Sequence, residues 1–163
     1  MSEKYPLHQL VLIKKRRLEE AERVLKEKKE ILKKEEETLK TLEEERDKTQ
    51  KHKKEKMDQL REELDKGTTT DKIEMMRDYI KVVDEELKQK QKKVETQEEK
   101  VKEAEKAVEA ARQDMLKKQQ DVEKLKMHKK EWDKEMKALE VHQEGLETDE
   151  LGTAMHSSKK RKR

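Results

Sequence analysis

Side chains that often take part in catalysis are numerous in this 163-residue sequence, but their spacing does not fit a catalytic or metal site. The three glycines are isolated, so no glycine-rich loop is available to bind phosphate groups. The absence of cysteine excludes disulfides, cysteine-based zinc sites and thiol catalysis. The histidines are scattered without the spacing of metal ligands, at His8, His52, His128, His142 and His156.

Carboxylates are also abundant, with 41 Asp and Glu residues. A pair of catalytic carboxylates needs a pocket that excludes water, because only such a pocket separates their two pKa values. A chain made mainly of long helices offers no such pocket. We therefore predict no catalytic, metal-binding or cofactor-binding residues, and we expect that the protein is not an enzyme.

Two other features are candidates for binding a partner. The C-terminal run SSKKRKR, at 157–163, fits a nuclear-localisation or nucleic-acid-binding patch, or a disordered terminus that aids solubility. It lacks aromatic residues and no basic stripe continues from it, so we favour the disordered terminus and expect no specific nucleic-acid binding. The second feature is Trp132, the only tryptophan in a chain without phenylalanine. Aromatic anchors of this kind are typical of interface hot spots.

The composition predicts the elements that must hold these residues. Charged residues make up 52% of the chain and hydrophobic residues only 29%, which is too little for a thick core. Basic and acidic residues are nearly balanced, at 44 and 41, and helix breakers are rare. This pattern is typical of long helices in a coiled coil. No apolar run is long enough to span a membrane, and the order of charges at the N-terminus does not fit a secretory signal.

A seven-residue repeat in the second half is the strongest signal. Apolar residues alternate at spacings of four and three from Ile73 to Leu146, and such a repeat stays buried only in a left-handed supercoil with a partner helix. The only polar residues on this seam are Lys90, Gln97, Lys118, Lys129 and Gln143.

The first half carries a matching but weaker seam. Its apolar members are Val11, Leu18, Ala21, Leu25, Leu32, Leu39 and Leu42, followed later by Leu60 and Leu64. Between these two groups the seam turns polar at Arg46, Thr49 and Lys53. These residues either fix the register of the two helices or make the hairpin locally loose, and we favour the register interpretation.

The stretch DKGTTTD, at 65–71, separates the two seams. Gly67 can adopt the left-handed conformation that ends a helix, and Asp71 with Glu74 fits an N-cap and its capping-box partner. So short a turn makes the helices antiparallel neighbours. We predict an all-α fold, a long antiparallel two-helix coiled-coil hairpin. Its parts are a lead-in at 1–5, helix 1 at 6–65, a turn at 66–70, helix 2 at 71–147 and a disordered basic tail at 148–163.

Helix 2 is predicted to extend past the beginning of helix 1. If the chain folds back at residues 67–68, paired residue numbers sum to about 135, which places Leu7 near His128. Trp132, Met136 and later seam residues then have little helix opposite them. Either an external partner covers this apolar stripe, which we favour, or the N-terminal segment folds back over Trp132.

The N-terminal stretch YPLHQLVLIKKRRLEEAERVLKEKK, at 5–29, together with the glycine turn and the second long helix, resembles the YscO/FliJ family of type III secretion and flagellar export proteins, and most of all its chlamydial YscO-like branch. The resemblance implies a cytoplasmic coiled coil that is similar to the central stalk of rotary ATPases. The implied partners are the export ATPase ring, the export gate and secretion chaperones.

In that family arrangement, the end of the hairpin that bears both termini enters the ATPase ring. Here that end comprises residues 7–17 and 126–146. The resemblance therefore implies that the residues binding the ATPase are Leu7, Leu10, Val11, Arg16, Arg17, Trp132, Met136 and Leu139.

The expected function is that of a non-enzymatic component of a type III secretion apparatus, a stalk-like partner of the export ATPase and an escort for chaperones. We expect a monomeric hairpin in the bacterial cytoplasm, peripheral to the inner-membrane secretion apparatus and without membrane insertion. The alternative is a generic coiled-coil scaffold or tether, which predicts a dimer. A third candidate, nucleic-acid binding through the tail, predicts an affinity that falls steeply with salt.

Overall fold

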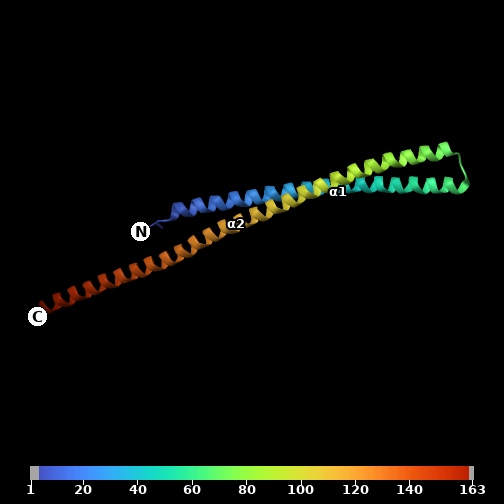
Figure 1. Ribbon diagram of the computed structural model, residues 1–163. Helices are drawn as coiled ribbons and strands as arrows, with labels where there is room; N and C mark the ends of the chain where they lie inside the picture. Colours follow the sequence, from blue (N-terminus) through green and yellow to red (C-terminus); the bar gives the residue numbers. More distant parts are fainter. Residues whose placement is uncertain (1–3, 162–163) are drawn as a thin grey trace. The chain divides into compact units, whose positions relative to one another are not determined.

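The computed structural model describes residues 4–161, which form two α-helices and no strand. Helix α1 runs over His8–Lys66 (59 residues) and helix α2 over Thr70–Arg161 (92 residues), joined by a short turn (Figure 1). The predicted all-α, antiparallel two-helix hairpin is confirmed. Helix α1 begins two residues later than predicted, because the backbone at Tyr5–His8 forms a turn in which His8 N–H donates to the Tyr5 carbonyl at 3.1 Å.

The turn between the helices depends on Gly67. Its φ of +73° lies in the left-handed region, which favours glycine, and its N–H donates to the Leu64 carbonyl at 3.3 Å. Helix α2 then starts one residue earlier than predicted. The hydroxyl of Thr69 accepts a hydrogen bond from the Lys72 N–H at 3.4 Å, so Thr69 rather than Asp71 is the N-cap. Asp71 lies in the first turn, where a negative charge is favourable.

The C-terminal boundary also needs correction. The sequence predicted that helix 2 ends at 147, whereas α2 continues to Arg161, so residues 148–161 are helical rather than a disordered tail. Gly145 and Gly152 lie within this helix, and an isolated glycine costs a helix only about 1 kcal/mol. Good helix formers lie between and after these glycines. Residues 162–163 lie outside the described part of the chain.

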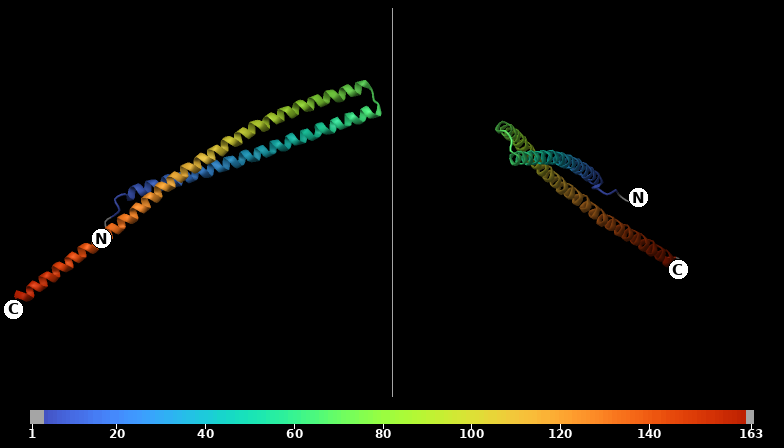
Figure 2. Two further views of the ribbon diagram at one scale, coloured as in Figure 1. Left: turned by 60° about the horizontal axis from the view of Figure 1, so that its bottom comes forward. Right: turned by 90° about the vertical axis from the view of Figure 1, so that its right-hand side faces the viewer.

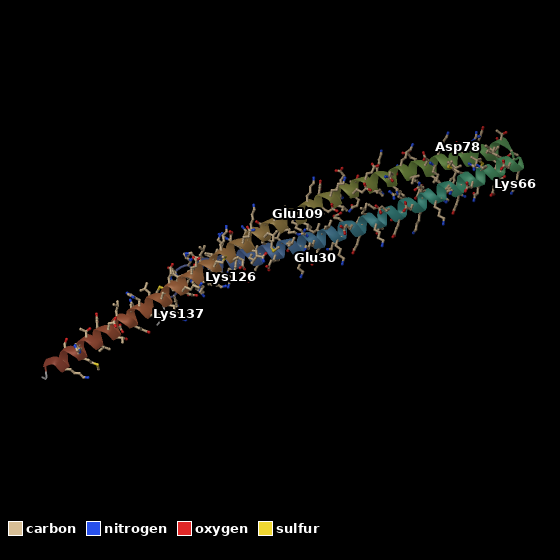
Figure 3. All side chains as sticks on the ribbon, turned by 90° about the horizontal axis from the view of Figure 1, so that it is seen from below. Glu30, Lys66, Asp78, Glu109, Lys126 and Lys137 are labelled. Carbon is tan, nitrogen blue, oxygen red and sulfur yellow. The ribbon has the colours of Figure 1, made fainter. Side chains whose placement is uncertain are left out.

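The hairpin consists of two compact units. The turn unit comprises residues 23–113, in which the two helices run antiparallel beside each other (Figure 2). Its most deeply buried side chains are Val83 and Val94. Both lie on the predicted seam of α2, as do the unit's other buried α2 residues: Gln97, Val101, Ala104, Val108 and Ala111. The heptad prediction is therefore confirmed for the turn unit, and charged side chains such as Glu30 and Asp78 project outward (Figure 3).

The seam of α1 is confirmed up to Leu60, but its last predicted member is wrong. Leu64 is 45% exposed. The neighbouring Glu63 is only half-exposed and its carboxylate lies 3.3 Å from the Lys72 ammonium. A helix turns by about 100° per residue, so an error of one position moves a side chain off the interface.

Contacts between the two helices give the register. Contacting residues have numbers that sum to between 131 and 139, as in His52–Tyr79 and Thr49–Lys90, around the predicted value of about 135. In the terminal unit, which comprises residues 1–22 and 114–163, Lys14 lies 3.7 Å from Asp121. This unit also buries Ala21 and Val122 between the helices.

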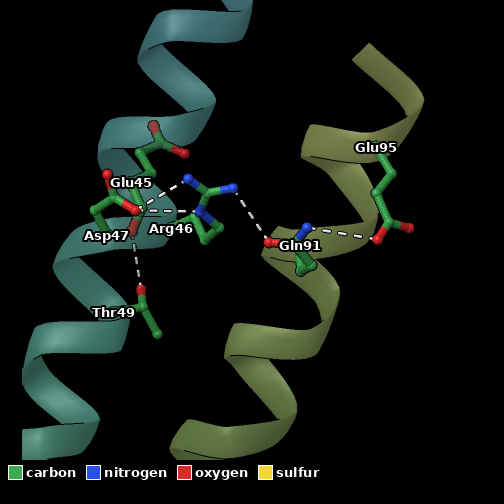
Figure 4. A network of polar contacts seen from close by, with 6 residues as sticks. All are labelled: Glu45, Arg46, Asp47, Thr49, Gln91 and Glu95. Carbon is green, nitrogen blue, oxygen red and sulfur yellow. Dashed lines mark hydrogen bonds and ion pairs between the residues drawn. The ribbon is translucent and has the colours of Figure 1, made fainter. Parts of the chain in front are cut away.

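Polar seam residues of the turn unit form hydrogen bonds both within α1 and from one helix to the other. Arg46 donates to the Gln91 side chain at 3.3 Å, and the hydroxyl of buried Thr49 donates to the Glu45 carbonyl at 3.1 Å (Figure 4). The Lys90 ammonium in turn donates to the Thr49 hydroxyl at 2.6 Å. In the described residues, every buried side-chain nitrogen or oxygen has a hydrogen-bond partner. Such specific contacts favour one alignment of the helices, as the register interpretation requires.

The ion pair between Lys53 and Asp84 belongs to the same segment. The Lys53 ammonium donates to the Asp84 carboxylate at 2.6 Å, and the Lys88 ammonium lies 3.4 Å from its other oxygen. The hydrogen bond from Lys53 lowers the pKa of the Asp84 carboxyl below its usual value, with further help from the positive charge of Lys88.

Candidate partner-binding site

The aromatic residues of the terminal unit form a cluster around Trp132. Tyr5, which precedes α1, is 6% exposed, and its ring packs against Trp132 in a T-shaped arrangement with the ring centroids 5.4 Å apart. The Tyr5 hydroxyl hydrogen-bonds to Nδ1 of His128, one turn before Trp132 on α2. The centroids of the Tyr5 and His128 rings are 5.7 Å apart. The N-terminal segment therefore folds back over Trp132, the second of the two alternatives that the sequence left open.

This contact leaves Trp132 half-buried beside an open groove of about 590 Å³. The groove is bounded on one side by the N-terminal segment and the first residue of α1, and on the other by α2. We call it the Trp132 groove; it is lined by Lys4, Tyr5, His8, Lys129, Trp132, Asp133, Met136, Lys137 and Glu140. Its volume lies within the range of about 300–1,000 Å³ that is typical of ligand pockets.

The structure brings only part of the predicted ATPase-binding set into this groove. Trp132 and Met136 line it, while Leu139 lies beyond it and is 52% exposed. The remaining members, all on or just before α1, are not part of the lining: Leu7 and Val11 are half-buried, and Leu10, Arg16 and Arg17 are exposed.

Sequence reasoning did not include Tyr5 in the candidate site. The usable signal was the predicted register, which places residue 5 opposite about residue 130 and thus within reach of Trp132. Lys4, His8 and Lys129 were missed as well. In a sequence, a polar side chain that lines a groove cannot be told from one on any solvated helix face.

Past the groove, α2 continues without a neighbouring helix. Every residue from Lys137 to Lys159 is exposed, and in Figure 1 this last part of α2 continues beyond the first turn of α1. The charge also changes here. Residues 138–158 contain five acidic residues and neither lysine nor arginine, although the chain has 44 basic residues in all. This acidic overhang, residues 138–158, is a surface free for contact with another molecule.

A second apolar surface lies in the turn unit, near the loop. Met75, Tyr79 and Val82 share one face of α2, and Met75 is 72% exposed. A groove of about 400 Å³ beside them is lined by Lys56, Gln59, Lys72, Met75, Met76 and Tyr79. The Tyr79 hydroxyl lies 2.8 Å from Nε2 of His52, which holds the ring in place. We call the three exposed residues and this groove the turn patch.

Two further properties concern the described part of the chain, residues 4–161. It holds no group of three or more His, Asp or Glu side chains arranged to bind a metal ion. Neither of its helices contains a stretch apolar enough to cross a membrane.

These features define a two-helix hairpin with an open groove between the start of α1 and the facing part of α2. The chain belongs to the YscO-like family, whose family model matches residues 2–162. It is also similar to the solved structure of CT670 from Chlamydia trachomatis, a protein described as a YscO homolog. The two share 43% sequence identity with a TM-score of 0.93, over 99% of this chain and 100% of CT670. No curated protein sequence matches the chain.

The family resemblance drawn from the sequence is thus confirmed, and with it a role related to type III secretion.

Proposed function

We propose that this chain is a non-enzymatic component of a type III secretion apparatus that binds the export ATPase as a stalk-like partner and also escorts chaperones. The observation that carries the proposal is the Trp132 groove followed directly by the exposed acidic overhang. A half-buried tryptophan beside an open groove is typical of an interface anchor, and the overhang supplies additional contact surface. Membership of the YscO-like family supports the same assignment.

The proposed mechanism is organisational. A long helix pair offers its terminal end to the ATPase ring, and it couples to the ring only if it binds some states of the ring more tightly than others. The charged faces of the helices steer the encounter and contribute little to affinity. This activity belongs in the bacterial cytoplasm, at the inner-membrane secretion apparatus.

The turn patch supports the second half of the proposal. Methionine-rich surfaces adapt to varied partners because the side chain is flexible and polarisable. The exposed Met75 and the neighbouring Met76 make the turn patch suited to the export gate or to chaperones of differing sequence. Since the turn patch and the Trp132 groove share no residue, one chain could bind the ATPase and a chaperone together.

The proposal is tested with the purified chain and its cognate export ATPase, by measuring binding and ATP hydrolysis. Trp132→Ala and Met136→Ala should each weaken binding by about tenfold or more, as is usual for interface anchors. Met127→Ala is the matched control, because Met127 is an exposed methionine of α2 outside the groove. Failure of the wild-type chain to bind the ATPase, or an equal effect of the control, would count against the proposal.

The solution mass separates this proposal from a generic coiled-coil tether. An intramolecular hairpin is monomeric, whereas a tether with helices paired between chains is a dimer. The monomer mass in sedimentation equilibrium is the expected result.

A further inference from the structure

We infer that the Trp132 groove is a preformed socket for an apolar side chain of a partner segment in which carboxylates flank that side chain. This inference names the chemistry of the partner surface, and it rests on the proposed function for the assignment of that partner to the export ATPase.

The apolar part of the socket is already built in the free protein. Tyr5 is buried and lines the groove from the N-terminal segment, while Trp132 and Met136 line it from α2. The hydrogen bond to His128 and the ring contact with Trp132 fix the Tyr5 side chain. A wall held in this way does not need to be ordered when a partner arrives, so less entropy is lost on binding.

The rim of the groove carries more positive than negative charge. Among the described residues that line it, three are lysines (Lys4, Lys129 and Lys137) and two carry carboxylates. Lys129, Asp133 and Lys137 follow one another at four-residue spacing along α2, so Asp133 lies between two lysines and can offset only one of them.

Among the described residues, the wall formed by Lys4, Tyr5 and His8 contributes one lysine and no carboxylate. A carboxylate beside the bound apolar side chain therefore finds a lysine on either wall.

The charge distribution also limits where an acidic partner can bind. Glu140, at the far end of the groove, begins the acidic part of the overhang, which contains no lysine or arginine up to Ser158. Like charges at close range are unfavourable, so an acidic segment fits the Trp132 groove and is repelled by the overhang. The lysines around the groove thus favour a negatively charged partner segment, and the acidic overhang limits how far along α2 that segment can extend.

Two synthetic helical peptides test this inference with the full-length chain. Both carry one central leucine and no tryptophan or tyrosine; one has glutamates around the leucine and the other has lysines at the same positions. Because Trp132 is the only tryptophan, its fluorescence reports binding in the groove. The glutamate peptide should change Trp132 emission and bind roughly tenfold more tightly than its lysine twin. Raising the salt concentration should reduce this difference.

Reversing the charge of lysines that line the groove tests whether they cause the preference for the glutamate peptide. Lys129→Glu combined with Lys137→Glu should remove or invert the preference for the glutamate peptide. The control double variant, Lys130→Glu with Lys134→Glu, makes the same charge change at exposed positions of α2 outside the groove, and should keep the preference. Tyr5→Ala should weaken the binding of both peptides, whereas Tyr5→Phe, which retains the ring, should weaken their binding less.

Equal affinities of the twin peptides, no response of Trp132, or loss of the preference in the control variant would each overturn the inference. The two proposals fail separately. If the glutamate peptide is preferred but the export ATPase does not bind, the socket inference is supported and the proposed function is refuted. If the ATPase binds through Trp132 while the two peptides bind with equal affinity, the proposed function is supported and the socket inference is refuted.

Discussion

Adjacent valines on α2 provide a matched test of the helix interface. Val83 is 2% exposed and lies on the heptad seam, whereas Val82 is 55% exposed on the outer face. Val83→Ala removes two methyl groups from a buried site, which costs about 2 kcal/mol when the cavity is included. Alanine returns about 0.5 kcal/mol through its higher helix propensity. The net loss is about 1.5 kcal/mol, or about 3–6 °C in Tm for a chain of this size.

Val82→Ala makes the same chemical change without removing a buried contact. Only the gain in helix propensity remains, so Tm should stay unchanged or rise by about 1–2 °C. Thermal unfolding of both variants, followed by circular dichroism, measures the difference directly. An equal or larger loss of stability in Val82→Ala would refute the assignment of Val83 to the interface.

Three further predictions concern stability. Replacing Arg46 and Lys53 together by leucine should raise Tm, because apolar side chains on a coiled-coil seam stabilise it; a lower Tm would contradict the seam assignment. Since Lys53 lowers the pKa of Asp84, the stability from this pair is present above the ordinary aspartate pKa of about 4 and is lost as pH falls through the lower pKa of the folded state. Asp84→Asn should therefore flatten the acid limb of a plot of Tm against pH, and an unchanged limb would refute the role of the pair. Gly67→Ala should cost about 1–2 kcal/mol because of its positive φ, whereas Gly145→Ala, in a helix with open space around it, should stabilise by up to about 1 kcal/mol in denaturant unfolding. Equal effects of the two glycine substitutions would be inconsistent with this geometry.

The seven-residue repeat of apolar residues determines most of the fold, and for this reason the hairpin could be predicted from the sequence. Apolar residues at four- and three-residue spacing identify the buried face of α2 from Val83 to Val122, and the position of Gly67 sets the register. Both signals are local and periodic, so neither requires knowledge of distant contacts. The contact between Lys14 and Asp121 shows how closely the register follows from the position of the turn.

Details that depend on a single turn of helix were harder to predict. Leu64 and Glu63 differ by one position, and apolarity alone pointed to the wrong one. Asp71 and Thr69 are both good N-caps, and the choice between them depends on the backbone path after Gly67. The tail was predicted to be disordered from its small and basic residues, although nothing in it prevents α2 from continuing to Arg161.

The candidate site was predicted in part. The unpaired stripe at Trp132 and Met136 follows from the unequal lengths of the two helices, and these residues do line the groove. The sequence could not decide between an external partner and the N-terminal segment as the cover of Trp132, because a few residues before a proline follow no helical period. Tyr5 therefore entered the site only through the structure.

Fluorine NMR on the chain carrying fluorotryptophan at its single tryptophan, alone and with the export ATPase added, tests whether the ATPase binds at Trp132. Only Trp132 is labelled, so tryptophans of the ATPase do not interfere. We expect the Trp132 resonance to shift or broaden when the ATPase binds, and Met127→Ala to leave this change intact. Binding at the Trp132 groove would be refuted by an ATPase that cosediments with the chain while the Trp132 resonance stays unchanged, and also by an ATPase that does not bind.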